Sequence, residues 1–254
     1  MFTRVFITIF VVFVAGFVAG TANADLVAHW TFDEGEGTVA HDSAGSYDGT
    51  VNGASWTAGK VGGALAFNGT SNYVYVPDND ALDITGDITI AAWVYFNRGG
   101  NGQDGSQQSI VAKTLGNGSY NTPYDFRTSA NAEPMLYISR SDATGHEAVS
   151  NTQTIPLLSW HHLAVTVSNN VADFYIDGVL SITEGMLTKP AAGNSRPLYI
   201  GRRDNGLYLN GLIDDVRLYN NALSQSEIQA LIPEPATLLL FGFGALMLNR
   251  KSRS

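Results

Sequence analysis

Three aspartates are the residues of this chain best suited to bind a metal ion. Asp33 and Asp42 fall in glycine-rich turns near the N-terminal end, and Asp214 lies in an apolar run close to the C-terminal end. Ca²⁺ takes about six to eight oxygen ligands from carboxylates, backbone carbonyls and waters, and glycines leave carbonyls accessible. We therefore expect a calcium site in which Asp214 is joined by Asp33 or Asp42.

The alternative for the same residues is a purely structural role. Side chains alternate along a strand, so Asp214 and the adjacent Asp215 are expected on opposite faces, one towards the N-terminal strand and one outward. Aspartates in turns commonly accept hydrogen bonds from their own backbone. Asp33 and Asp42 would then be turn residues, and Asp214 a solvated carboxylate at the sheet edge.

The sequence gives little support for a catalytic site. A retaining glycosidase needs two carboxylates about 5–5.5 Å apart. Glu34 and Glu36 have a suitable spacing, but they lie in a turn broken by glycines. His161 and His162 are adjacent, so on a strand they point to opposite faces and cannot chelate together. The chain contains no cysteine. We expect a non-catalytic domain and keep a glycoside hydrolase with an unusual carboxylate pair as the alternative.

A sugar-binding surface is predicted in a loop. Tyr120, Tyr124 and Asn117 come from a stretch rich in Gly, Asn and Ser around residues 116–123. Long loops on a rigid sandwich commonly carry binding residues. Aromatic rings stack on sugars, and amides bond their hydroxyls, so these three residues are the candidate ligand contacts. The alternative is that the tyrosines pack the loop against the domain.

Short strands must position all of these residues. Runs of β-branched and aromatic residues alternate with Gly, Asn, Asp and Pro, which predicts an all-β, two-sheet antiparallel sandwich. One short C-terminal helix is expected at 225–231, because Ser224 and Glu227 form a capping box. The expected strands are 26–32, 73–76, 88–95, 109–113, 124–127, 135–139, 162–167, 171–176, 198–202 and 212–219.

The two ends of the chain read as export and sorting signals. Residues 1–24 contain a basic residue, an apolar run and an Ala-Asn-Ala cleavage site, which is the order of a secretory signal peptide. Residues 233–254 begin with Pro233, Glu234 and Pro235, continue with an apolar run, and end in basic residues. That run has about 13 residues, fewer than the ~20 of a relaxed membrane span. We expect membrane contact through this segment, transient if the tail is cut and permanent if it is kept.

Composition limits the domain between these ends, residues 25–232. Without the ends, Glu234 leaves the count of 23 acids, and Arg4, Arg250, Lys251 and Arg253 leave the 14 bases. The domain then has 22 acids, 10 bases and a net charge of −12. Nucleic-acid binding requires a basic footprint, so nucleic acid is not an expected partner.

Several segments together resemble a laminin-G-like, concanavalin A-like jelly roll. They are residues 30–37 (WTFDEGEG), 160–166 (WHHLAVT), 175–178 (YIDG), 199–202 (YIGR) and 211–224 (GLIDDVRLYNNALS). The resemblance implies a domain that binds rather than catalyses. It also implies that the aspartate at position 214 binds calcium together with carbonyls of the N-terminal segment.

The tail resembles a PEP-CTERM sorting signal, carried by Pro233, Glu234 and Pro235, the apolar run and the basic end. That resemblance implies processing by an exosortase, a membrane-embedded peptidase, in addition to signal peptidase. We expect an exported binding or adhesion domain at the cell surface or in the extracellular matrix. Its ligand would be a polysaccharide or a surface protein, and a passive structural matrix protein is a further alternative.

Overall fold

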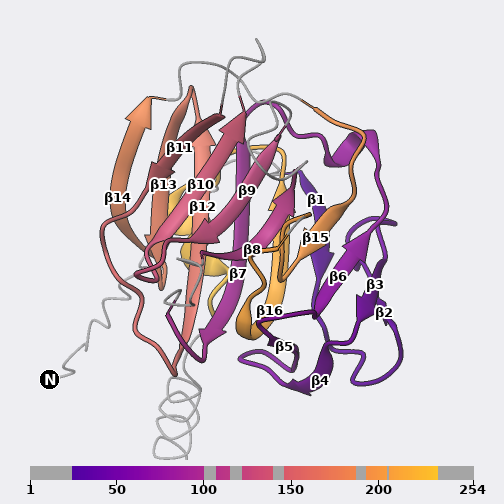
Figure 1. Cartoon of the computed structure of the whole chain (residues 1–254). Helices are drawn as coiled ribbons and strands as arrows, with labels where there is room; N and C mark the ends of the chain where they lie inside the picture. The colour runs from indigo at the N-terminus through magenta and orange to yellow at the C-terminus, as the bar shows by residue number, and fades with distance from the viewer. Residues whose placement is uncertain are drawn as a thin grey trace, which may run out of the picture.

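Two antiparallel sheets face each other in the computed structural model of the chain (Figure 1). The structure describes residues 25–99, 107–114, 122–139, 146–186, 193–204 and 206–233. The predicted signal peptide and all but the first residue of the predicted tail lie outside these ranges. The all-β sandwich with one short C-terminal helix that the sequence predicts is confirmed.

The first sheet contains the strand that carries Asp214. Its strand order is β14-β13-β12-β7-β16-β5-β4, and β1 also pairs with β16. The bounds are β1 Leu26–Trp30, β4 Ser55–Ala58, β5 Gly63–Asn68, β7 Ile88–Phe96, β12 Trp160–Ser168, β13 Val171–Ile176, β14 Val179–Met186 and β16 Asn210–Tyr219. The long strands β7 and β16 occupy its centre, so residues on them are held by neighbours on both sides.

The second sheet forms the front layer of Figure 1. Its order is β11-β10-β9-β8-β15-β6-β3-β2. The bounds are β2 Val39–Ala40, β3 Gly49–Asn52, β6 Tyr73–Val76, β8 Gln108–Lys113, β9 Tyr124–Thr128, β10 Pro134–Ser139, β11 His146–Ser150 and β15 Leu198–Ile200; a single 3-10 turn, η1 (Asp80–Leu82), follows β6.

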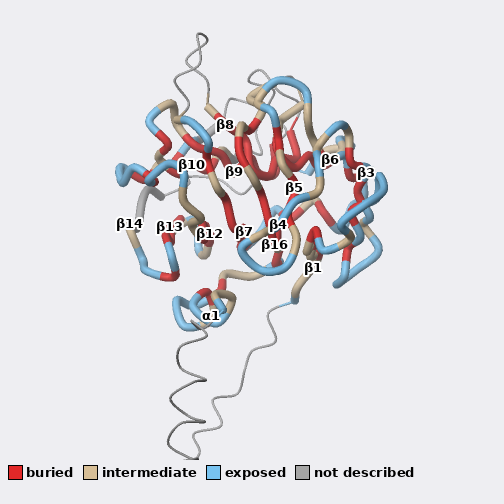
Figure 2. Tube along the Cα trace, turned by 90° about the horizontal axis from the view of Figure 1, so that it is seen from below, coloured by how far each residue is buried: buried red, intermediate tan, exposed pale blue. Residues whose placement is uncertain are grey.

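Side-chain alternation places the core between the two layers. Val74 and Val76 of β6 point inward, whereas Tyr75 between them is exposed. Figure 2 shows the same pattern along the sheets, with buried residues concentrated between the layers and exposed ones at the turns. Within the described residues, the core clusters use only positions from 26 to 231. The core of the described residues thus lies between the two predicted end segments.

Tight hairpins join the strands β12, β13 and β14. Asn169 and Asn170 have φ of 49° and 65°, and Asp177 and Gly178 have φ of 52° and 75°. Positive φ at both central residues matches the right-handed twist of the flanking strands, and Asn, Asp and Gly tolerate it best. The residues at both turns therefore suit the conformation that these hairpins require.

A β-bulge on β16 changes the predicted orientation of the paired aspartates. The register with β7 shifts between Asp214 and Arg217, and Asp215 has a φ of 51°. Ile213 and Val216 both lie in the core, with two residues between them instead of one. The expectation that Asp214 and Asp215 point to opposite faces is thus wrong, because the extra residue leaves both outside the core.

The helix α1 (Gln225–Ala230) covers part of the outer face of the first sheet (Figure 2). The Ser224 side chain accepts a hydrogen bond from the N–H of Glu227, and the Glu227 carboxylate accepts one from the N–H of Ser224. Ile228 is fully buried in a small cluster on the outer face of that sheet. The predicted capping box is confirmed, and the helix ends one residue earlier than expected.

Candidate functional site

Asp214 is a buried carboxylate with one unsatisfied oxygen. Its exposed fraction is 0%. Oδ2 accepts hydrogen bonds from the N–H groups of Lys60 and Val61, each at 2.8 Å, whereas Oδ1 is buried without a hydrogen-bond partner. Burial raises the pKa of Asp214 to about 7, and the charges of Asp215 and Asp33 add to this rise against the two N–H groups. A cation at Oδ1 would supply the missing partner.

The loop around Asp214 can be built only with glycine. A Cβ added at Gly59 would collide with the carbonyl oxygen of Gly63 and lie 2.5 Å from Asp214 Oδ2. One added at Gly63 would collide with the carbonyl oxygen of Phe32. Real Cβ atoms do not approach other atoms so closely, so the glycines allow backbone carbonyls and the carboxylate to crowd together.

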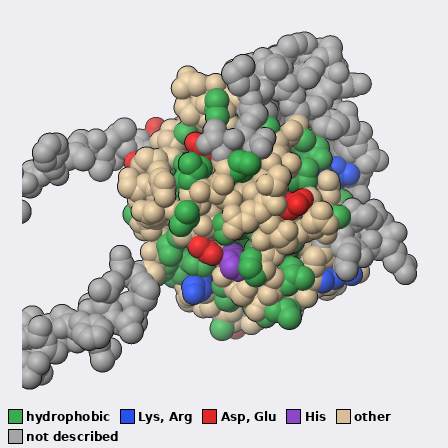
Figure 3. Space-filling model, turned by 90° about the vertical axis from the view of Figure 1, so that its left-hand side faces the viewer, with side chains coloured by type: hydrophobic (Ala, Val, Ile, Leu, Met, Phe, Trp, Pro, Cys, Tyr) green, Lys and Arg blue, Asp and Glu red, His purple; other side chains and the backbone are tan. Residues whose placement is uncertain are grey.

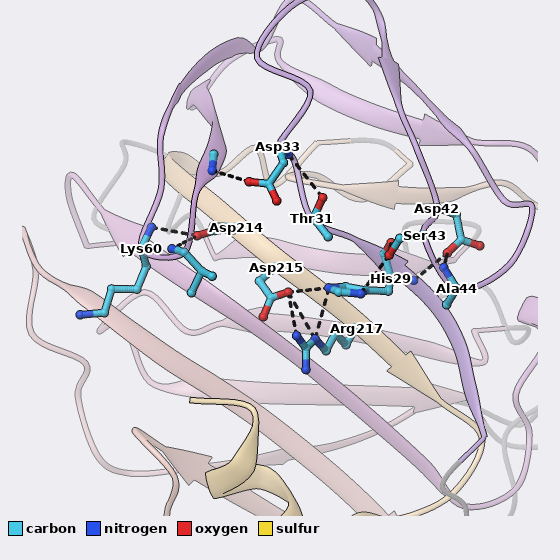
Figure 4. Close-up of polar contacts among 12 residues, drawn as sticks. His29, Thr31, Asp33, Asp42, Ser43, Ala44, Lys60, Asp214, Asp215 and Arg217 are labelled. Atoms are coloured by element: carbon cyan, nitrogen blue, oxygen red, sulfur yellow. Dashed lines mark hydrogen bonds and ion pairs between the residues drawn. The ribbon is translucent and has the colours of Figure 1, made fainter. Parts of the chain in front are cut away.

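Asp33 reaches the same loop from the N-terminal segment. Its Oδ1 accepts a hydrogen bond from the N–H of Gly63 at 2.6 Å, and Figure 4 shows Asp33 and Asp214 each in contact with this stretch. Two carboxylates beside backbone carbonyls form the oxygen-rich donor set that Ca²⁺ prefers, so these residues fit a calcium ion. In the described ranges, no three His, Asp or Glu side chains gather into a metal-binding group. Carbonyls and waters would have to complete the coordination.

Asp42 is not brought to this loop. Its Oδ1 accepts hydrogen bonds from the N–H groups of His29 at 2.8 Å and Ala44 at 3.0 Å, and its Oδ2 accepts one from Tyr47 at 3.1 Å. Figure 4 shows it beyond the His29 ring, away from Asp214. Asp42 therefore stabilises a turn, which is the alternative role that the sequence predicted for it.

Asp215 anchors a polar network that the sequence did not predict. Its Oδ1 lies 2.5 Å from His29 Nε2 and 3.1 Å from Arg217 Nη2. Burial alone would raise the pKa of Asp215, but the hydrogen bond from His29 and the charge of Arg217 outweigh it and lower that pKa. His29 and Arg217 are cross-strand partners between β1 and β16. The network joins the N-terminal strand to the strand of Asp214.

Next to Asp214 across the sheet lie two further buried polar side chains. Trp93 of β7 pairs with Asp214 on one side and with His162 of β12 on the other. Burial lowers the pKa of His162 to about 4, and the rings of Trp93 and His162 meet edge to face with centroids 5.3 Å apart. The Trp93 indole N–H and His162 Nδ1 have no hydrogen-bond partner.

Glu34, which was considered for catalysis, and Asp177 both accept hydrogen bonds in turns. Glu34 Oε1 accepts a hydrogen bond from the N–H of His41 at 2.6 Å. Asp177 Oδ1 accepts one from the N–H of His162, and its Oδ2 lies 2.8 Å from His161 Nδ1. Ser159 Oγ lies 2.9 Å from His161 Nε2, so these side chains fasten the β13–β14 turn to the start of β12.

The predicted sugar contacts are corrected in part. Tyr124 is fully buried, and its hydroxyl donates a hydrogen bond to the carbonyl of Leu82 at 2.9 Å. Burial also raises the pKa of the Tyr124 hydroxyl well above its usual range. Its ring has no free face for a sugar, because the residue opens strand β9 with its side chain towards the core. Tyr120 and Asn117 lie outside the described residues.

Figure 3 shows the side of the domain at the β14 edge. Hydrophobic side chains are scattered among polar ones there, and few charges lie on the part of this side that the structure describes. Single exposed residues such as Val179 (60%) and Leu158 (64%) are common on soluble proteins. This side therefore indicates no particular ligand.

The fold and the site define a class of protein: an antiparallel jelly-roll sandwich with a buried carboxylate beside a glycine-rich loop. The family comparison agrees, since residues 68–229 match the concanavalin A-like lectin/glucanases superfamily. The chain belongs to that superfamily. Residues 231–253 match the PEP-CTERM protein-sorting motif, which confirms the sorting signal expected at Pro233, Glu234 and Pro235.

Solved structures with the same fold have varied functions. Domain 4 of AbnA, a GH43 extracellular arabinanase from Geobacillus stearothermophilus solved with arabinotriose, has a TM-score of 0.62 at 21% identity, covering 83% of this chain and 99% of that one. The binding domain of Paraclostridial Mosquitocidal Protein 1 has a TM-score of 0.66 at 17% identity, covering 82% of this chain and 51% of that one. At these identities the likeness shows the fold alone.

A curated relative is far longer than this chain. Adhesion G-protein coupled receptor V1 of Danio rerio is 26% identical over 132 residues, which are 50% of this chain and 2% of the receptor. The chain therefore corresponds to a small part of that protein. Within the described residues, no helix is long and apolar enough to cross a membrane, and the tail predicted to contact it lies beyond them.

Proposed function

We propose that this protein is an exported, non-catalytic binding domain, sorted to the cell surface or extracellular matrix, where it binds polysaccharide. The observation that carries the proposal is the pairing of a lectin-superfamily sandwich with a C-terminal sorting motif. Such a motif is useful only to a protein that leaves the cytoplasm, and the fold is shared with a domain solved in complex with arabinotriose.

Processing of both ends belongs to the same proposal. Signal peptidase would cut after Ala24, and an exosortase-type peptidase would act near Pro233 and remove the apolar run. Intact mass of the protein isolated from its host tests both steps. A mass matching residues 25 to about 232 supports them, and a mass that includes residue 254 contradicts tail removal.

Calcium is proposed as a structural partner of the domain. Asp214, Asp33 and the carbonyls of Phe32 and Gly63 would hold the ion, whose charge would neutralise two neighbouring carboxylates. The support is the partnerless Oδ1 of Asp214 and the glycine loop, whose Gly59 lies close to both the Gly63 carbonyl oxygen and Asp214 Oδ2. The ion would thereby join the N-terminal segment to the centre of the first sheet.

Calorimetric titration of metal-free residues 25–232 with Ca²⁺ tests this part. We expect saturable binding in the wild type, loss of binding in Asp214→Asn, and no loss in Glu36→Gln. Glu36 is a matched control because it is an exposed acid in the same N-terminal region. Absence of heat at millimolar calcium, or binding unchanged by Asp214→Asn, would remove the ion from the proposal.

A further inference from the structure

The outer face of the second sheet carries an arginine among tyrosines, and these residues take no part in the site around Asp214. Tyr73 and Tyr75 come from β6, and Tyr199 of β15 pairs directly with Tyr75. Arg202 and Tyr208 follow β15 in the chain. We call these five residues the tyrosine–arginine face. The strands β6 and β15 lie side by side in the front layer of Figure 1.

These rings are arranged around the guanidinium group. The Tyr199 ring meets those of Tyr73 and Tyr75 edge to face, with centroids 5.8 and 5.9 Å apart. The Arg202 guanidinium carbon lies 3.8 Å from the Tyr73 ring centroid and 4.2 Å from that of Tyr199. Arg202 Nη1 donates a hydrogen bond to the Tyr208 hydroxyl at 3.1 Å. The group is therefore held in one place by aromatic contacts.

Arg202 lacks an acidic partner. In the described part of the chain no carboxylate forms an ion pair with it, and its Nε is buried without a hydrogen-bond partner. The residue is only half-buried, so its remaining donors can meet a ligand. A guanidinium binds a carboxylate through hydrogen bonds of its planar fork, and a ligand carboxylate would here take the Nη hydrogens that Tyr208 and Tyr199 leave free.

Its surroundings are rich in arginine although the domain is acidic. Arg127 lies on the same face of the sheet, 3.1 Å from Asp125, with its guanidinium over the Tyr137 ring. It is 3% exposed, and its Nε has no hydrogen-bond partner. Arg203 lies near Asp125 and Arg127, and Asp204 Oδ1 lies 3.5 Å from the Tyr199 hydroxyl. Three arginines thus meet two aspartates here, in a domain whose net charge is −12. The face is therefore less acidic than the domain as a whole.

We propose that the tyrosine–arginine face binds an acidic sugar, with a uronate carboxylate on Arg202 and the sugar ring against Tyr75. Tyr75 supplies the accessible aromatic surface, since 37% of it is exposed. The face lies on the opposite side of the sandwich from Asp214, so this binding does not depend on calcium. The inference rests on the proposed polysaccharide-binding function and specifies its ligand class.

The test compares two ligands that differ only in the carboxylate. Residues 25–232 are titrated calorimetrically with tetragalacturonate and with its methyl ester, each with calcium and with EDTA. We expect the acid to bind at least about tenfold more tightly than the ester, because hydrogen bonds between charged groups exceed neutral ones. We also expect EDTA to leave the difference unchanged. Equal binding of acid and ester would overturn the inference, and so would no binding of either.

Substitutions in the tyrosine–arginine face test whether the acidic sugar binds there. Arg202→Gln should lower affinity for the acid to that for the ester, Arg202→Lys should fall between them, and Tyr75→Ala should weaken both ligands. Arg196→Gln is the matched control, because Arg196 is an exposed arginine outside this face. Unchanged binding by Arg202→Gln would contradict the assignment, and the ligand comparison tests it independently if that variant fails to fold. If neutral polysaccharide binds and the acid does not, the proposed function stands and only the acidic-sugar inference falls.

Discussion

Replacing Asp214 by Asn should stabilise the metal-free domain at neutral pH. The folded state raises the pKa of Asp214 from 3.8 to about 7, so ionisation opposes folding. Each pKa unit corresponds to about 1.4 kcal/mol, which sets an upper bound of about 4 kcal/mol. Solvent reaches the loop through the exposed residues Lys60 and Val61, and this screening lowers the expected effect to about 2 kcal/mol.

The direction in which stability changes with pH follows from proton binding by Asp214. Between pH 3.8 and about 7 the folded wild type keeps a proton that the unfolded chain releases, so its stability falls as pH rises through this window and then levels off. The Asp214→Asn variant has an uncharged amide where the protonated acid has a hydroxyl, so it lacks this dependence. The two proteins should match below pH 4, and the variant should be more stable at pH 8.

The assay is urea and thermal unfolding of residues 25–232 in EDTA and in calcium, at pH 4 and pH 8. In EDTA at pH 8 we expect the variant to melt about 4–8 °C higher, the shift that about 2 kcal/mol gives a domain of this size. Calcium should reverse the order by stabilising only the wild type, by about 2.7 kcal/mol at a hundred times its dissociation constant. A difference independent of pH, or equal stabilisation of both proteins by calcium, would refute the reasoning.

Three further predictions concern buried and capping residues. Burial lowers the pKa of His162 to about 4, so stability should fall as pH drops from about 6.5 to 4, and imidazole NMR should show a ring that stays neutral down to about pH 4; a titration near pH 6.5 would contradict this. Tyr124→Phe should cost about 1–3 kcal/mol in urea unfolding, because the Leu82 carbonyl loses its donor, and leave sugar binding unchanged; weakened sugar binding would restore Tyr124 as a ligand contact. Ser224→Ala should cost about 1 kcal/mol and speed amide exchange at Ile228, and unchanged exchange would show that the cap is dispensable.

Local sequence signals predicted most of the fold. The strands β6 and β13 begin and end where the residue pattern places them, and the capping box located α1. The pattern did not predict β4, β5 or β14, which contain residues such as Gly63 and Gly185 that are rare in strands. β4 pairs with β5 and β14 with β13, both through short connections, and β5 pairs in addition with the distant β16. Pairing in the sheet therefore stabilises these strands in spite of their residue preferences.

The candidate sites were predictable only in part. Asp214 and Asp33 meet at one loop as expected, but the role of Gly59 and Gly63 depends on a close approach between segments far apart in the chain. The prediction that Asp214 and Asp215 point to opposite faces assumed that side chains alternate along the strand, and the bulge at Asp215 interrupts that alternation. Arg202 and Tyr73 are more than a hundred positions apart, so no sequence spacing could indicate their contact.

Polysaccharide binding without cleavage is the claim on which this account most depends. Purified residues 25–232 should migrate more slowly in native gels that contain an acidic polysaccharide such as polygalacturonate, and prolonged incubation should release no reducing sugar. Release of reducing ends would show a glycoside hydrolase instead. Unretarded migration with every polysaccharide of the host matrix would contradict the binding function itself.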